Sequence, residues 1–155
     1  MRVEDLLGDD PAEAARRFAA VIARSDDTHA SQVWVGRFVG ELDRMAEREE
    51  FGRVLDTWGI SNAEAGRLFG VTRQAIGKWR ANGLPDERRA AIGDLAAVTD
   101  LLVHYLKRER VPAVVRRPAD RLGGCSMVDL VGEGRSSELL DFTRSMFDLR
   151  RLDAA

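Results

Sequence analysis

The chain has 155 residues, 45% of them apolar, with one cysteine and two histidines. This length and apolar content suffice for a buried core, whereas so few cysteines and histidines exclude an internal disulfide, the usual zinc sites and a Ser–His–acid motif. We therefore expect a protein that is not an enzyme and has no catalytic residues, metal or cofactor. The sequence has no apolar run of about 18 residues and no leader with a cleavage site, so we also expect it to be cytoplasmic, with no membrane partner.

The net charge of −2 hides an uneven distribution along the chain. Residues 1–50 carry 12 acidic residues and seven arginines, and residues 91–155 are balanced. Residues 51–90 carry seven basic and four acidic residues, a balance of +3, and no acidic residue lies between Arg67 and Arg80. Positive charge is therefore concentrated in the one stretch where the patterns described below would need it to attract phosphates.

The N-terminal part is predicted to form a helical extension. One helix opens at Pro11 and ends in a polar run to Thr28, and a second follows Ser31. The second helix carries apolar residues at three- and four-residue spacing, a pattern typical of a face that is buried in a core. These residues are Val33, Trp34, Phe38, Leu42 and Met45. The apolar pattern continues to Trp58, so the helix can extend behind the unit that follows.

Residues 61–85 contain two short helical patterns separated by a turn too tight to be a linker. Ser61 can cap the first helix, and Glu64, three residues later, can complete a capping box. Gly70 can end this helix, because a residue without a Cβ adopts the left-handed conformation without strain. Thr72 then offers its hydroxyl as the cap of a second helix. The pattern predicts a helix-turn-helix.

The second helix, predicted over residues 73–80, buries Ile76 and Trp79 against the first. Its outward side then carries polar, basic and small residues of the kind that read base edges or bind phosphates. We assign these residues to DNA binding: Thr72, Arg73, Gln74, Gly77, Lys78 and Arg80. The alternative interpretation is a helical hairpin with a solvated basic face.

Each polar residue of this outward set has a plausible partner on DNA. Gln74 can pair in bidentate fashion with adenine, Arg73 can contact guanine or a phosphate, and Lys78 can contact a phosphate or guanine. Gly77 lets the helix approach the groove closely, at a cost of about 1 kcal/mol of helix stability. The second helix is therefore predicted to be the recognition helix of a repressor that binds operator sequences in double-stranded DNA.

Pro85 is predicted to open the longest helix of the chain, which keeps an apolar stripe to about Lys107. A long amphipathic helix after a DNA-reading unit is commonly a dimer seam, and a simple core helix explains the stripe equally well. A single helix-turn-helix contacts few base pairs, so we expect a homodimer that reads a pseudo-palindrome. Its seam is predicted to be this helix or the extension around Trp34 and Phe38.

Beyond the long helix the composition changes, because residues 111–134 hold two prolines and four glycines and must contain turns and short elements. Ser126 can cap a short helix through Val131, and Ser136 or Ser137 can cap a final one. The final helix carries apolar residues that either close the protein's own core or anchor a partner: Leu139, Leu140, Phe142, Met146, Phe147 and Leu149.

The predicted fold is all-α, since no strand pattern of convincing length occurs in the sequence. We divide it into three parts. Residues 1–50 form the helical extension, residues 51–110 form the helix-turn-helix domain with its long following helix, and residues 111–155 form a small helical C-terminal module.

Three stretches of the chain carry a resemblance to a known family. They are T-R-Q-A-I-G-K-W-R in the second helix, the G-L-P that follows it, and R-R-P-A-D-R-L-G-G-C-S-M-V-D-L-V near the C-terminus. In this order, over residues 51–147, the chain resembles the Xre/MbcA/ParS-type bacterial antitoxins. The resemblance implies that the helix-turn-helix represses the protein's own operon and that the C-terminal module binds and blocks a RES-domain toxin that consumes NAD.

The resemblance also implies which residues belong to the toxin-binding module: Arg117, Pro118, Leu122, Gly123, Gly124, Asp129 and Leu130. The cognate toxin protein is thus a predicted partner beside DNA. The alternative is a stand-alone, sequence-specific DNA-binding regulator with no toxin partner, such as a phage-type immunity repressor.

Overall fold

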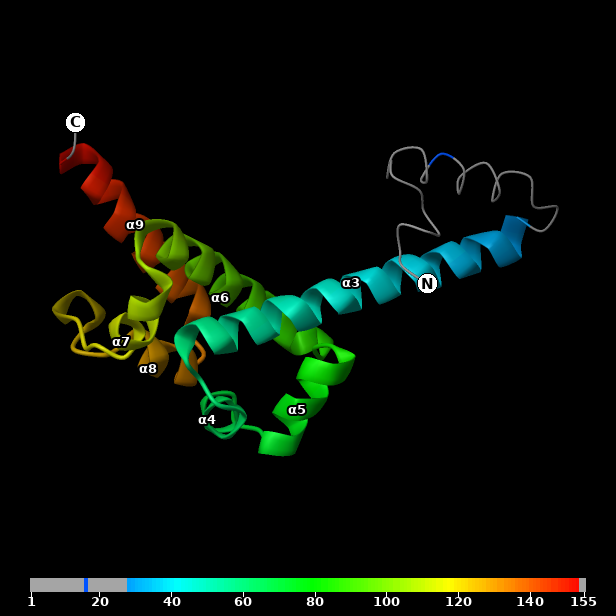
Figure 1. The fold of residues 1–155 in the computed structure, drawn as a ribbon, viewed down its shortest axis with the longest axis horizontal. Helices are drawn as coiled ribbons and strands as arrows, with labels where there is room; N and C mark the ends of the chain where they lie inside the picture. The colour runs from blue at the N-terminus through cyan, green and yellow to red at the C-terminus, as the bar shows by residue number, and fades with distance from the viewer. Residues whose placement is uncertain (1–15, 17–27, 154–155) are drawn as a thin grey trace. The chain divides into compact units, whose positions relative to one another are not determined.

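The computed structural model describes residue 16 and residues 28–153, and every regular element in this part of the chain is helical (Figure 1). This confirms the predicted all-α fold. The helices are α3 (Thr28–Trp58), α4 (Asn62–Leu68), α5 (Arg73–Asn82), α6 (Asp86–Tyr105), α7 (Val111–Val115), α8 (Met127–Gly132) and α9 (Ser136–Asp153), with 3-10 turns at Arg108–Arg110 and Asp120–Leu122. The helix predicted to open at Pro11 lies outside the described residues.

The chain divides into two compact units, of which the second comprises residues 44–155. Helix α3 runs through this boundary as one continuous helix of 31 residues. It begins at Thr28, earlier than the predicted start after Ser31. It is also longer than the 20-residue α6, so the prediction that the helix after Pro85 is the longest was wrong.

The apolar stripe in the N-terminal half of α3 is exposed, contrary to the prediction that it lies in a core. Val33, Phe38, Leu42 and Met45 keep 42–48% of their surface accessible, as does Val39. The side chain of Trp34 lies outside the described residues. The periodicity correctly indicated a helix, but a repeat of apolar residues defines a face without specifying what covers it. Among the side chains of α3 whose burial is described, the first that is completely buried is Phe51.

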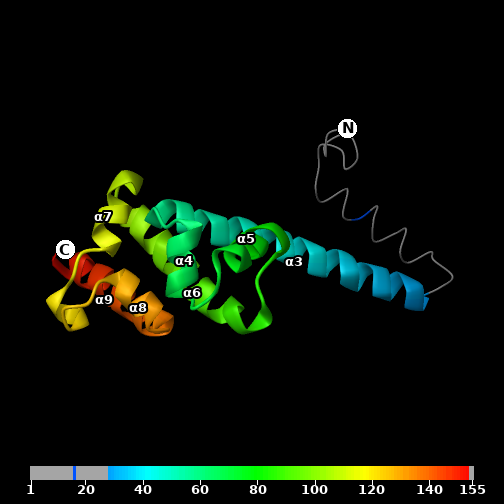
Figure 2. The same ribbon diagram turned by 90° about the horizontal axis from the view of Figure 1, so that it is seen from below.

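A single core holds the second unit together. Its largest fully buried side chains come from the end of α3, from α5 and α6, and from the C-terminal helices: Phe51, Leu55, Trp58, Ile76, Ile92, Leu102, Leu130 and Leu139. Helices α6 and α9 pack against each other, side by side in both views (Figure 2). Residues 51–110 and 111–155 therefore share one core, and the boundary predicted at residue 110 is not a break in packing.

The apolar stripe of α6 faces this core. Leu95, Val98 and Leu102 are at most 2% exposed, and Tyr105 stacks on Phe147 of α9 with ring centroids 4.2 Å apart. Because α9 and the end of α3 already cover the stripe, the core interpretation of α6 is confirmed and the dimer-seam interpretation was wrong. The same packing places Phe147 in the protein's own core.

Candidate DNA-binding helix and partner groove

Helices α4 and α5 form the predicted helix-turn-helix, and both predicted caps are present. The Ser61 Oγ accepts a hydrogen bond from the Glu64 amide at 3.2 Å, and the Thr72 Oγ1 accepts one from the Ala75 amide at 3.1 Å. Gly70 has a φ of +66°, the left-handed value that ends α4. Helix α5 starts at Arg73 as predicted and continues two residues further, to Asn82.

Gly66 explains how the two helices approach so closely. A Cβ at this position would lie 2.8 Å from the Val71 carbonyl oxygen and 3.3 Å from the Arg73 amide nitrogen. The Val71 amide in turn donates to the Gly66 carbonyl at 2.8 Å. Any larger residue would push the turn away from α4, so this glycine fixes the angle at which α5 leaves the body of the protein.

Three aromatic rings hold the inner face of α5. Trp79 packs against Phe69 of the turn and Phe51 of α3, with ring centroids 6.0 Å apart in both pairs, and Phe51 meets Phe69 at 6.2 Å. Ile76 beside them is fully buried. These tilted and edge-on contacts bury α5 on one side only, as the predicted inward pair Ile76 and Trp79 requires.

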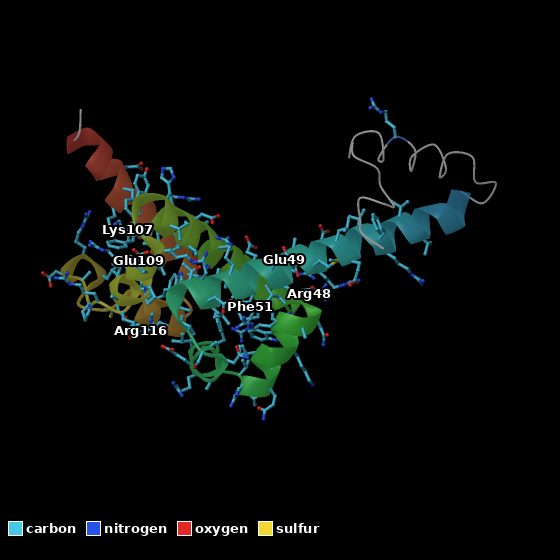
Figure 3. All side chains as sticks on the ribbon, viewed as in Figure 1. Arg48, Glu49, Phe51, Lys107, Glu109 and Arg116 are labelled. Carbon is cyan, nitrogen blue, oxygen red and sulfur yellow. The ribbon has the colours of Figure 1, made fainter. Side chains whose placement is uncertain are left out.

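Polar contacts at the end of α5 change the role predicted for Arg80. Its guanidinium donates to the Asp56 carboxylate of α3 at 3.1 Å and to the Asn62 side-chain oxygen at 3.3 Å. Arg48 of α3, marked in Figure 3, donates to the Ala81 carbonyl at 2.8 Å. Arg80 thus ties α5 to α3 and α4, and the structure gives no support to its assignment as a DNA contact.

The outer face of α5 has the opposite character. Arg73, Gln74 and Lys78 are exposed, and they make no side-chain hydrogen bond or ion pair to any residue that the structure describes. A Cβ on Gly77 would meet nothing within 4 Å. Thr72 is exposed, but its hydroxyl already caps the helix. Three of the six predicted DNA-binding side chains therefore stand on this face with their polar groups available.

The C-terminal candidates divide into four exposed residues of the loop and three residues that help to build the module. Arg117, Pro118, Gly123 and Gly124 are exposed, and both glycines have a positive φ, at +68° and +83°. They make the tight turn that joins the 3-10 helix Asp120–Leu122 to α8, a backbone path that other residues rarely adopt.

The other three candidates, Leu122, Asp129 and Leu130, have roles in the fold of the module itself. Leu130 is fully buried and Leu122 is 8% exposed, so both belong to the core of the protein. Asp129 uses its carboxylate to accept hydrogen bonds from the Ser126 hydroxyl at 2.7 Å and amide at 2.8 Å, completing a capping box on α8. These bonds lower the pKa of Asp129 below its usual range. Leu122 and Leu130 therefore build the core of the module, whereas Asp129 caps α8 while remaining exposed.

A groove of about 500 Å³ opens beside the exposed set. Its apolar lining comes from α7, the 118–122 loop, α8 and α9: Val114, Pro118, Leu122, Met127, Phe142 and Met146. Arg117 and Asp120 stand at its polar edge. Phe142 and Met146 are spaced four residues apart and only half-buried, so they lie on one face of α9 without being sealed in the core. Sequence reasoning did not include Val114 or Met127, because nothing local links them to this groove.

Arg116, just before the exposed set, connects it to the helix-turn-helix (Figure 3). Its guanidinium donates to the Trp58 carbonyl at 2.7 Å, the Gly59 carbonyl at 3.0 Å and the Glu64 carboxylate at 3.1 Å. Glu64 therefore does not close the capping box predicted for α4. Instead, it forms an ion pair that holds the start of α4 against the end of α7.

The described residues form neither a metal-binding cluster nor a helix suited to span a membrane. Among them, no group of three or more His, Cys, Asp and Glu side chains is placed to bind a metal ion. None of the helices described combines the length and apolar character that crossing a membrane requires.

These features define the class: an all-helical protein in which a helix-turn-helix and a C-terminal helical segment share one core. The fold is similar to that of a chain in the crystal structure of the M. tuberculosis MbcT–MbcA toxin–antitoxin complex. The TM-score is 0.53 at 21% sequence identity, over 64% of this chain and 91% of that chain. No protein-family model and no curated protein matches the sequence.

Proposed function

We propose that this protein is an antitoxin that captures a partner toxin, RES-type as the family resemblance implies, and that represses its own operon through α5. The observation that carries the DNA-binding part is the exposed face of a capped, rigidly anchored helix on which Arg73, Gln74 and Lys78 have no partner in the described chain. The similarity of the fold to a chain from a toxin–antitoxin complex supports the antitoxin part.

The geometry of α5 suits insertion into the major groove. Its inner side is fixed by Ile76 and Trp79, so the outer side chains are presented on a rigid support. Gln74 has the bidentate amide that pairs with adenine, and Arg73 has the guanidinium that pairs with guanine. Gly77 leaves open space for the approach of a groove wall. In this proposal Gln74 and Arg73 specify sequence and Lys78 binds phosphate.

The test is a titration of the full-length protein with DNA from upstream of its own gene and with random DNA of equal length. Lys78→Ala is expected to weaken binding to both DNAs. Lys107→Ala is a matched control, because these are the two lysines of the chain, both exposed, and Lys107 lies outside the helix-turn-helix. Equal binding by wild type, Arg73→Ala, Gln74→Ala and Lys78→Ala on both DNAs would remove the DNA-binding proposal.

The partner surface is proposed to be the groove between α7 and α9. Arginine and aromatic side chains dominate the energetics of protein interfaces, and here Arg117 borders a floor that contains Phe142. Met127 and Met146 add flexible apolar surface that adapts to a partner's shape. The exposed turn Gly123–Gly124 lies in the same segment. Leu130 and Asp129 contribute by holding this segment in place.

Co-expression with the neighbouring toxin gene tests this surface. The chain must remain intact, because residues 111–155 supply Leu130, Leu139 and Phe147 to the common core. Arg117→Glu combined with Met146→Glu is expected to abolish rescue of the cells. Arg144→Glu is the control, since this exposed arginine also lies on α9 but does not line the groove. If wild type itself gives no rescue and no gene product co-purifies, the stand-alone regulator remains.

A homodimer is proposed to form through α3. The stripe of α6 is covered within the chain, whereas Val39 and Leu42 of α3 are each 48% exposed. Light scattering should give the mass of a dimer for wild type and of a monomer for Val39→Glu with Leu42→Glu. A monomeric wild type at high micromolar concentration, together with a non-palindromic footprint, would contradict this part.

A further inference from the structure

A second positively charged feature lies beside the helix-turn-helix. A hollow of about 330 Å³ opens where the end of α4 meets α6 and the junction of α8 with α9, helices that Figure 2 shows together. Arg67 and Gly70 line it from the α4 side, Arg88 from α6, and Glu133 and Ser136 from the junction. This hollow is separate from the partner groove and from the outer face of α5.

The charges that remain available in this hollow are both positive. The side chains of Arg67 and Arg88 make no hydrogen bond or ion pair with any residue in the described chain. The Glu133 carboxylate is already paired, because it accepts a hydrogen bond from Arg135 at 2.6 Å; Arg135 also donates to Glu138 at 2.6 Å and 2.9 Å, so one guanidinium is shared by two carboxylates. The hollow therefore presents two guanidinium groups that no neighbouring carboxylate satisfies.

Most other arginines of the same region are committed to the fold. Arg80 binds Asp56 at 3.1 Å, and Arg89, next to Arg88, binds Glu47 at 2.9 Å and Asp86 at 3.0 Å. The paired arginines tie α5 and α6 to α3. Arg67 and Arg88 do not take part in this network, although Arg88 is the direct neighbour of Arg89 in the sequence.

The walls of the hollow are preformed. Helix α8 packs closely on α4, since a Cβ at Gly132 would lie in van der Waals contact with the Leu68 side chain, at 3.4 Å. Leu95 and Val131, which line the base, are at most 5% exposed, and Ser136 is 7% exposed. A ligand entering the hollow would therefore not have to order its walls.

The position of the hollow relates it to α5. Gly70 lies on its rim, and α5 begins three residues later at Arg73. A duplex whose groove receives the start of α5 carries a sugar–phosphate backbone along the edge of that groove, next to the turn. Arginine binds phosphate with two parallel N–H donors that carry a positive charge, which strengthens both hydrogen bonds.

We propose that this hollow holds a backbone phosphate of the DNA that α5 reads, with Arg67 and Arg88 donating hydrogen bonds to its oxygens. The inference rests on the proposed DNA binding and extends it. The contact carries no sequence information. It fixes the register of α5 in the groove from a wall that belongs partly to the C-terminal segment.

The experiment measures DNA affinity between 50 and 200 mM salt for the full-length protein. The logarithm of the DNA association constant K falls linearly with the logarithm of the salt concentration, and each phosphate contact that a substitution removes makes this slope shallower by about 0.9. Arg67→Gln and Arg88→Gln are each expected to weaken operator and random DNA by the same factor. When the salt is raised from 50 to 200 mM, the factor by which the double variant loses affinity should be about ten times smaller than the factor for wild type, as two missing contacts predict.

Two controls remove the same charge elsewhere. Arg89→Gln breaks existing ion pairs one residue away, and Arg121→Gln removes an exposed charge from the C-terminal segment. Both should keep the wild-type slope to within about half of the change expected for one phosphate contact. Thermal unfolding of all five variants, the double variant included, checks that they are folded.

Slopes that are equal for Arg67→Gln, Arg88→Gln and Arg121→Gln would overturn the proposal of the hollow. If Gln74→Ala still relaxes base preference in that case, the proposed function stands without it. If wild type binds no DNA, both fail. Loss of toxin binding instead of DNA binding in the Arg67 and Arg88 variants would assign the hollow to the protein partner.

Discussion

The outer face of α5 and the segment from Arg117 to Leu130 were both predicted to be binding sites. In the structure, the two sets of residues differ in their exposure and in their hydrogen bonds within the chain. On α5, Arg73, Gln74 and Lys78 are exposed and unpartnered within the described chain. In the C-terminal segment, Leu130 is buried and the Asp129 carboxylate caps α8. Only part of the second set is on the surface.

The difference comes from the kind of signal that each assignment used. The outward face of α5 follows from helical spacing, because burial of Ile76 and Trp79 dictates which residues point away. The C-terminal set follows from a short sequence motif. Such a motif includes the residues that form the turn and the helix cap as well as any residues that contact a partner. Gly123, Gly124 and Asp129 satisfy the turn and the helix cap. The motif therefore identifies the structure of the segment more directly than its contacts.

The largest expected effect separates the two kinds of residue within the C-terminal segment. Leu130→Ala should lower the free energy of unfolding by about 2–5 kcal/mol, because it leaves a cavity in the common core. Arg117→Ala, at an exposed position, should change it by less than about 0.5 kcal/mol. Urea titrations of both variants check this. A small effect of Leu130→Ala would return that residue to the surface set.

A smaller effect tests the support of the DNA-binding face. In Gly66→Ala the new methyl group would lie 2.8 Å from the Val71 carbonyl oxygen, so the turn must shift. We expect a loss of about 1–3 kcal/mol in unfolding free energy, comparable to an overpacked core. Operator affinity should fall with it, since α5 would leave at a different angle. Unchanged unfolding and DNA affinity would show that the close approach of α4 and the turn is unimportant.

The capping box on α8 gives an effect of about 1 kcal/mol. Ser126→Ala removes the side chain that caps the helix and one of the bonds to Asp129. Hydrogen bonds from Ser126 lower the pKa of Asp129 from 3.8. The stability that these bonds to the ionised carboxylate contribute is therefore fully present above about pH 4, and it is lost as the pH falls through the lowered pKa. Unfolding of Asp129→Asn should accordingly show a weaker pH dependence in the acid range than wild type.

The smallest expected effect has opposite signs for stability and binding. Gly77→Ala should stabilise α5 by about 0.5–1 kcal/mol, because alanine is the better helix former and its Cβ meets nothing within 4 Å. If Gly77 allows close approach to DNA, the same change should weaken operator binding. Thermal unfolding and a DNA titration on one preparation measure both. Tighter DNA binding by the more stable variant would contradict the role given to Gly77.

The sequence predicted those features that depend on residues a few positions apart. The caps by Ser61, Thr72 and Ser126, the break at Gly70 and the burial of Ile76 all follow from local spacing, and the structure confirms them. The all-α fold class follows from the same signals, since capping and terminating residues in the sequence mark where each helix begins and ends.

What could not be predicted depends on contacts between distant residues. Arg80 lies on the exposed side of a helical wheel, but Asp56 and Asn62 on other helices capture its guanidinium. The periodicity of α6 could not reveal that α9 would cover its stripe. Arg116 is one of several arginines in the sequence, and its bond to Glu64 across 52 residues has no local signature.

The central claim is that the outer face of α5 reads DNA sequence, and the most direct measurement is selection of binding sites from a random DNA pool by wild type and by Gln74→Ala. We expect wild type to select a defined site and Gln74→Ala to lose about 1–3 kcal/mol of base preference at one position of each half-site, with the preferences at the other positions retained. Identical preferences at every position for the two proteins, or no enriched sequence for wild type, would contradict it.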